Sequence, residues 1–328
     1  MTQTTTEHRT RLALGGRFGG ASRQGNWLAP LVIIIGVTAL LIATTVDFAT
    51  PQNASNLLAQ AMPLIIVAIG QMIVIVLAGM DLSVGSVISM TTAILALDGS
   101  PAALIPLAFV AAMAVGLVNG VAIVRLNVHP IIATLSMQFI VLGIAQLLRP
   151  VAGGSVPEIV VTAVTGSLWG IPAPVFWAIF TIGLGWKILH GSRFGLHLFA
   201  IGGGAASGQT DAPANFGIPA ARNTIIAYLL SAFFAVLAGF FVAGRIASGD
   251  PSVGAQFALD SITAVAIGGT QLSGGVGSLH GTILGAILMA LLANGMNLAN
   301  LSAFLQGAIK GVILLLVVAL QSRKKMGL

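Results

Sequence analysis

The stretch "GMDLSVGS", residues 79–86, decides how this chain is interpreted, because it interrupts a long apolar run with a carboxylate, two serines and two glycines. A glycine can end one helix in a left-handed conformation, and Asp or Ser can cap the next helix by accepting hydrogen bonds from its free N–H groups. We therefore predict that a helix ends at Gly79 and that Asp81 or Ser83 caps a second helix.

The whole chain has the composition of an integral membrane protein. Of its 328 residues, 57% are hydrophobic and 7% are charged, and its mean hydropathy is +1.02. A soluble domain has roughly 25% charged residues. We predict an all-α polytopic membrane protein with a single transmembrane domain, residues 27–321, between cytoplasmic tails at 1–26 and 322–328.

Proline, glycine and charge divide the apolar sequence into about ten candidate transmembrane helices. They cover residues 27–46, 56–79, 82–97, 102–124, 130–148, 174–189, 223–246, 255–270, 279–297 and 304–321. The third, sixth and eighth are short for a full crossing, which predicts broken or re-entrant helices and a count of eight to ten. With both termini inside, most basic residues lie on the cytoplasmic side. Because they fall at segment ends rather than in one patch, we expect membrane lipid and no nucleic acid as a partner.

A second string later in the chain is similar to the first. "GTQLSGGVGS", residues 269–278, shares the pattern Gly-x-polar-Leu-Ser-x-Gly with residues 79–85, and each string separates two apolar helices. In the predicted topology both lie toward the cytoplasmic side, so a repeat built from them is parallel rather than inverted. Paired glycine-interrupted segments in two halves of a transporter point to its translocation path. Coincidence is the alternative, because a chain with 41 glycines matches itself readily.

From this pairing we predict the residues of the translocation path or its hinges. They are Asp81, Ser83, Gly85, Ser86, Gln271, Ser273 and Gly275. For Asp81 the purely structural interpretation, a helix cap that binds no ligand, stays open beside the functional one. Two further charges, Asp260 and Lys310, fall within predicted spans, where charges are costly and usually functional. Pairing them lowers the cost of both, but the sequence does not set their distance.

Several kinds of chemistry are missing from the sequence. None of the lysines follows a glycine in the way a phosphate-binding P-loop requires. The five histidines have neither metal-site nor triad spacing, and there is no cysteine. We predict no catalytic residue, no metal and no bound cofactor. If ATP supplies the energy, a partner subunit must bind and hydrolyse it.

Four segments together resemble the membrane permease subunit of bacterial ABC importers for monosaccharides of the ribose, xylose and galactose type. They are "AGMDLSVGSV", "IATLSMQFIVLGIAQLL", "SRFGLHLFAIGG" and "ALDSITAVAIGGTQLSGGVGSLHGTILGAILMALLANGMNL". The resemblance covers residues 55–321. It implies a fold like that of the vitamin B12 type of importer, a location in the bacterial inner membrane, and transport by alternating access. It also implies three partners: a second permease subunit, a cytoplasmic ATPase that uses ATP and Mg, and a periplasmic sugar-binding protein.

The resemblance also implies a cytoplasmic coupling segment, at about residues 191–222, that touches the ATPase. The family pattern Gly-Gly-Asn-Glu-x-Ala-Ala-Arg-x-x-Gly-Ile is matched here by Gly202, Gly203, Asp211, Ala212, Gly217 and Ile218. About five extra residues intervene, the arginine is absent, and Pro213 replaces an alanine. Because proline inside a short helix removes a donor, we expect a kinked coupling helix and an ATPase that has diverged to suit it.

Rival interpretations keep the membrane location but change the cargo or the energy source. A related ABC permease for branched-chain amino acids, nucleosides or a sugar-derived signal molecule is the nearest. An ion-coupled secondary transporter, in which Asp81, Asp260 and Lys310 are the coupling groups, belongs to another class. A channel or a purely structural membrane subunit is less well supported, because no filter-like loop or ring-forming charge pattern stands out.

Overall fold

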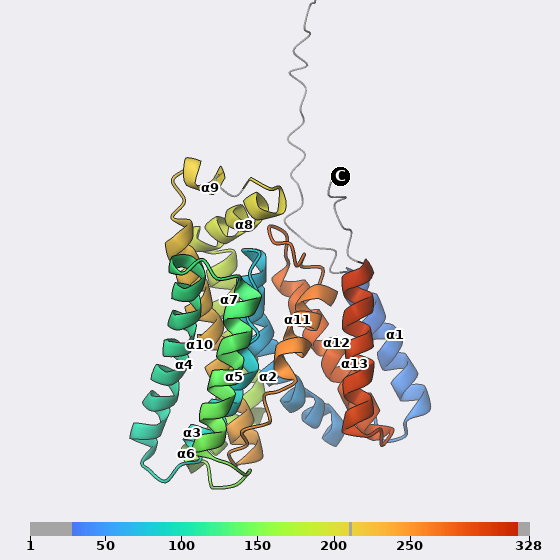
Figure 1. Cartoon of the computed structure of the whole chain (residues 1–328). Helices are drawn as coiled ribbons and strands as arrows, with labels where there is room; N and C mark the ends of the chain where they lie inside the picture. The colour runs from blue at the N-terminus through green and yellow to red at the C-terminus, as the bar shows by residue number, and fades with distance from the viewer. Residues whose placement is uncertain (1–27, 210–211, 321–328) are drawn as a thin grey trace, which may run out of the picture.

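The computed structural model describes residues 28–209 and 212–320, and these residues form a helical bundle with one small hairpin (Figure 1). The elements are α1 (Leu28–Thr44), α2 (Pro51–Val76), α3 (Val84–Leu95), α4 (Pro101–Arg125), α5 (Pro130–Leu148), α6 (Glu158–Thr165), β1 (Ser167–Leu168), β2 (Ile171–Pro172), α7 (Ala173–Leu189), α8 (Arg193–Ala206), α9 (Ala212–Asn215), α10 (Ala220–Ile246), α11 (Phe257–Ile267), α12 (Leu279–Leu298) and α13 (Ala303–Leu320).

Five of the described helices, α2, α4, α5, α10 and α12, are long and apolar enough to cross a membrane. The pair α7 and α8 passes the same test together, but it is bent by 65° at the break between the two helices. Four further apolar helices are shorter, and α3 and α11 among them correspond to the third and eighth predicted spans. The chain is therefore an all-α multi-pass membrane protein, whereas the count of ten spans and the likeness to the vitamin B12 type of importer stay predictions.

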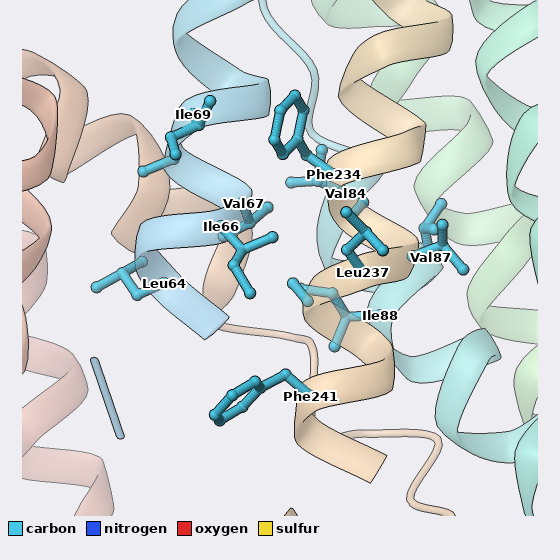
Figure 2. Close-up of a cluster of buried hydrophobic side chains, with 14 of the residues drawn as sticks. Leu64, Ile66, Val67, Ile69, Val84, Val87, Ile88, Phe234, Leu237 and Phe241 are labelled. Atoms are coloured by element: carbon cyan, nitrogen blue, oxygen red, sulfur yellow. The ribbon is translucent and has the colours of Figure 1, made fainter. Parts of the chain in front are cut away.

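The centre of the bundle is the place where α2, α3 and α10 meet. Figure 2 shows their aliphatic and aromatic side chains in one cluster, with Ile66 of α2, Ile88 of α3 and Phe234 of α10 among them. All three side chains have no exposed surface. Gly70 permits the close approach of α2 to α10, because a Cβ at Gly70 would lie 2.8 Å from the Cβ of Phe234.

Two sets of four helices have similar lengths and matching contacts. α2, α3, α4 and α5 contain 26, 12, 25 and 19 residues, and α10, α11, α12 and α13 contain 27, 11, 20 and 18. α2 packs on α12 as α10 packs on α4, and α3 packs on α5 as α11 packs on α13. The two sets are repeats of one structural unit.

The two units run in opposite directions through the bundle. α8 lies against the carboxyl end of α2, where Gly202 meets Val76, and also against the amino end of α10, where His197 lies 3.2 Å from Asn223. α2 therefore ends where α10 begins, as Figure 1 also shows. The repeat is inverted rather than parallel, an architecture typical of membrane transporters.

Between α5 and α7 the structure contains elements that the apolar pattern did not predict. α6 has eight residues, and the two-residue strands β1 and β2 pair in antiparallel register, Ser167 with Pro172 and Leu168 with Ile171. An eight-residue helix is too short to produce a span-length apolar signal. A hydrogen bond joins α7 to α6, because the indole N–H of Trp177 donates to the carbonyl of Ala163 at 2.9 Å.

Candidate functional site

The GMDLSVGS string forms the sharp break between α2 and α3. The prediction that Gly79 takes the left-handed conformation is wrong: Ala78 does so, with φ of 68°. Gly79 is required for space instead, because a Cβ there would lie 2.7 Å from the Tyr228 hydroxyl. The break is thus shaped by close packing against α10 as well as by backbone conformation.

Asp81 organises the start of α3. Its Oδ1 accepts hydrogen bonds from the Ser83 N–H (3.0 Å) and the Ser83 hydroxyl (2.6 Å). This is an Asx turn placed just before the helix, which begins at Val84. The predicted cap is not formed: Oδ1 of Asp81 accepts from the N–H of Ser83, which precedes the helix, and the Ser83 side chain accepts from no N–H of the first turn of α3.

Four helices enclose this turn. The amide of Gln71 on α2, oriented to satisfy both of its groups, donates to the Asp81 carbonyl (3.0 Å) and accepts from the Asp81 N–H (3.2 Å). Asn119 on α4 donates to the Ser83 hydroxyl at 2.9 Å. The Tyr228 hydroxyl of α10 and the Thr134 hydroxyl of α5 each donate to the Met80 carbonyl at 3.3 Å.

The consequence is that the turn is buried inside the protein. Asp81 and Ser83 are each 1% exposed and Ser86, whose hydroxyl donates to the Ser83 carbonyl, is 4% exposed. Oδ1 of Asn119 is buried beside them without a hydrogen-bond partner among the described residues, and the Ser231 hydroxyl of α10 lies against the Asp81 carboxylate. Such a turn can act as a hinge, whereas direct contact with a passing solute requires it to open.

A second copy of the motif, missed in the sequence, lies between α10 and α11. Residues 250–254 read Asp-Pro-Ser-Val-Gly, against Asp-Leu-Ser-Val-Gly at 81–85. Oδ1 of Asp250 accepts from the Ser252 N–H (2.8 Å) and the Ser252 hydroxyl (2.7 Å), which reproduces the Asx turn of the first copy. The shared pattern Asp-x-Ser-Val-Gly was the signal in the sequence. It marks the equivalent breaks of the two inverted units.

The two copies touch each other through their glycines. A Cβ on Gly85 would lie 2.5 Å from the Gly254 carbonyl oxygen, and a Cβ on Gly254 would collide with the Gly85 carbonyl. The Ser89 hydroxyl of α3 accepts from the Gly254 N–H at 2.9 Å. Gly85 is therefore a crossing point of the two units, which is why glycine is needed there.

The second string predicted from sequence, residues 269–275, occupies a different place. It follows α11 and precedes the 20-residue helix α12, so its flanking helices are not equivalent to α2 and α3. Gln271 and Ser273 are exposed, while the Gly275 N–H donates to the Val76 carbonyl at 2.9 Å. This string contacts the carboxyl end of α2 and is not its structural repeat. The prediction of a parallel repeat is wrong.

Residues 269–275 also touch the predicted coupling segment. Gly202 of α8 packs on Val76 and Gly275, and a Cβ on Gly275 would lie 2.7 Å from the Gly203 Cα. Three segments distant in sequence therefore meet at one end of the bundle: α8, the end of α2, and the loop before α12. A displacement of α8 would press on the backbone three residues before Gly79.

The rest of the predicted coupling segment is a short second helix, α9. Asp211 lies outside the described residues, and Ala212 begins α9. Gly217 follows α9 with φ of 71°, and the Ile218 N–H donates to the Pro213 carbonyl at 3.0 Å. Pro213 is the second residue of α9, where no N–H is needed, so the expected kink is absent. The segment instead breaks between α8 and α9.

The two predicted intramembrane charges form an ion pair. Nζ of Lys310 on α13 lies 2.6 Å from Oδ2 of Asp260 on α11, and both side chains are 14% exposed. The lysine also donates to Oε1 of Gln256 at 3.4 Å. This pair does not involve the Asp81 turn. The structure thus separates the predicted polar residues into three groups: the buried turn, the α8 contact and the ion pair.

A helical bundle of two inverted units, each with a broken helix at its centre, defines a multi-pass membrane protein of the transporter class. Comparison with known families agrees. Residues 53–318 match the family described as branched-chain amino acid transport system / permease component, and the chain belongs to this family. It is therefore a permease component of a transport system rather than an enzyme.

Several curated relatives are similar along nearly the whole chain. The ribose import permease protein of Haemophilus influenzae is 32% identical, with 92% of this chain and 93% of the relative covered. The ribose import permease protein of Escherichia coli is also 32% identical, covering 90% and 93%. The galactose/methyl galactoside import permease protein of Salmonella typhimurium is 32% identical, covering 89% and 93%. No solved structure matches the chain.

Proposed function

We propose that this chain is the permease subunit of an ATP-driven ABC importer that moves a monosaccharide across the bacterial inner membrane. The observation that carries the proposal is the full-length likeness to import permeases for ribose and for galactose, at 32% identity. The inverted pair of broken helices supports alternating access, because two packed units can rock against each other about a shared crossing point.

The nature of the cargo is the first point to test. The family description names branched-chain amino acids, whereas the relatives with 32% identity are named for sugars. Identity over nearly the whole chain favours the sugars, and ribose and galactose are the first compounds to test. Branched-chain amino acids, nucleosides and sugar-derived signals are the alternative cargoes.

The α8–α9 segment is the proposed docking site for the ATPase. It lies across one end of the bundle, and its contacts with Val76, Gly275 and Asn223 connect it to both inverted units. A force on α8 reaches the break after α2 through Val76 and the start of α10 through Asn223. ATP and Mg would bind to that partner, and this chain would supply the surface that moves.

Charge at the two ends of the bundle supports the orientation. α4 ends at Arg125, α8 begins at Arg193, and both lie at the α8 end of the bundle in Figure 1. α6 begins with Glu158 at the opposite end, where two basic residues, Arg149 and Arg245, also lie. By the positive-inside rule, the α8 end faces the cytoplasm. The other end would then receive a periplasmic sugar-binding protein, and a second permease subunit completes the pathway.

Whole-cell uptake tests this function. The chain is expressed with a candidate ABC ATPase and a candidate sugar-binding protein from the same organism, in cells that lack their own ribose and galactose transporters. Uptake of labelled ribose or galactose should require all three proteins and stop when a catalytic residue of the ATPase is mutated. Uptake that survives this mutation but collapses when the ion gradient is dissipated would replace the proposal with an ion-coupled transporter. If leucine is the only compound taken up, the cargo is a branched-chain amino acid and not a monosaccharide.

A further inference from the structure

The ion pair between Asp260 and Lys310 is not explained by the packing of the fold. The equivalent contact in the other unit, between α3 and α5, uses helices without a charged residue. Apolar side chains are therefore sufficient for this type of helix contact. Replacing a buried ion pair with apolar residues is often neutral or stabilising, and charges within a membrane domain are usually functional. The ion pair therefore has a role that is specific to the second unit, α10–α13, and is absent from the first.

A cavity of about 290 Å³ opens beside the pair, between α2, α11, α12 and α13. Five of its lining residues carry polar side chains: Gln60, Ser252, Gln256, Asp260 and Lys310. Leu64, Phe257 and Met289 are among the apolar residues of its wall. Ligand pockets are roughly 300–1,000 Å³ in volume, so this cavity suits a small solute.

The polar groups retain free hydrogen-bonding capacity. Oδ2 of Asp260 meets Lys310, but within the part of the chain that the structure describes Oδ1 accepts no hydrogen bond. Lys310 uses two of its three donors, on Asp260 and Gln256, and the side chain of Gln60 has no partner there. A carboxylate, an ammonium group and two amides thus offer both donors and acceptors at one cavity.

We propose that this cavity is a transient subsite for one monosaccharide molecule on its passage through the permease. The inference rests on the proposed function and deepens it. Each sugar hydroxyl both donates and accepts, so it matches a carboxylate next to an ammonium group, while Phe257 and Leu64 offer apolar surface to the C–H face of the ring. An amino acid side chain such as that of leucine would leave these polar groups unpaired.

Protection of a single thiol tests the subsite. The native chain has no cysteine, so one introduced thiol gives an unambiguous signal. Ala255 lines the cavity and is exposed, and Ala299 is an exposed alanine outside the cavity lining. The variants Ala255→Cys and Ala299→Cys, as full-length protein in nanodiscs, are treated with a water-soluble thiol reagent in the presence and absence of millimolar ribose or galactose. Glycerol at equal concentration controls for nonspecific effects.

The transported sugar should slow modification of the Ala255→Cys variant severalfold and leave the Ala299→Cys variant unchanged. Adding Asp260→Asn should raise the sugar concentration for half-protection by about tenfold or more, because a hydrogen bond to a charged group is lost. Since that change strands Lys310 and can impair folding, Gln60→Leu is the second variant, with an expected rise of about two- to tenfold. Gln52→Leu, on the same helix but outside the cavity lining, should change nothing.

The outcomes separate this proposal from the proposed function. ATP-dependent ribose or galactose uptake without protection of the Ala255→Cys variant would overturn the subsite and leave the function intact. Equal protection by glycerol, or protection unaffected by both Asp260→Asn and Gln60→Leu, would also overturn the subsite. Failure of every monosaccharide in the uptake assay would overturn the proposed function itself.

Discussion

The hydrogen bonds of Asp81 lead to the sharpest prediction, the difference between Asp81→Ala and Asp81→Asn. Both changes remove the charge, but only Asn keeps an oxygen that can accept from the Ser83 N–H and hydroxyl. In the Ala variant the buried Ser83 N–H loses its partner, at a cost of roughly 1–3 kcal/mol, and one hydroxyl bond worth about 1 kcal/mol is lost. The Ala variant should therefore unfold about 2–4 kcal/mol more easily than the Asn variant.

The assay is the apparent free energy of unfolding of the purified chain in an SDS titration, with sugar uptake measured in parallel. Asp98, exposed beyond the other end of α3, is the control, and Asp98→Ala should change stability by less than about 0.5 kcal/mol. Asp81→Asn should keep most of the uptake, because its amide oxygen can still accept from Ser83 and its amide N–H can donate to the Ser231 hydroxyl beside it. Equal losses of stability and uptake in the Asn and Ala variants would refute the hinge interpretation and point to the charge itself.

Three further predictions concern the contacts between segments. Gly254→Ala should destabilise the protein by about 1–3 kcal/mol in the same SDS titration, because its Cβ meets the Gly85 carbonyl. Gly143→Ala is the control, because a Cβ there has nothing within 4 Å and should be neutral or stabilising. Equal effects of the two changes would contradict the crossing point. Asn53 and Asn294 exchange two amide hydrogen bonds, at 3.1 and 2.8 Å, so a double-mutant cycle with alanine should give a coupling of about 1 kcal/mol, and zero coupling would contradict the pairing. Replacing residues 204–216 with the shorter family-type helix should abolish uptake driven by the native ATPase, and unchanged uptake would argue against a matched docking surface.

Much of the helical layout is predictable from the sequence, because apolar segments bounded by Pro, Gly and charge have little alternative to helices in a membrane. The short third and eighth spans correspond to α3 and α11, which are 12 and 11 residues long. The segment between α5 and α7 was not predictable in the same way, since α6 is too short to carry a span-length signal.

The candidate site was predictable only in part. The string at 79–86 marks a real helix break, but its partner is residues 250–254 rather than 269–275, and Pro251 in place of Leu82 hides the match. Inversion of the repeat depends on the directions of helices in space, which a string comparison does not contain. The role of Gly79 was not predictable for a related reason. Glycine is needed there because a side chain would meet the hydroxyl of Tyr228, a residue 149 positions away in sequence.

The initial rate of sugar uptake into proteoliposomes tests most directly whether this chain is an ATP-driven sugar permease. The chain is reconstituted with its ATPase, with the binding protein outside and ATP inside, and labelled ribose or galactose is added. ATP-driven import predicts accumulation against a gradient that requires both ATP and the binding protein and persists when the membrane potential and proton gradient are abolished. Accumulation without ATP that follows an imposed ion gradient would contradict it.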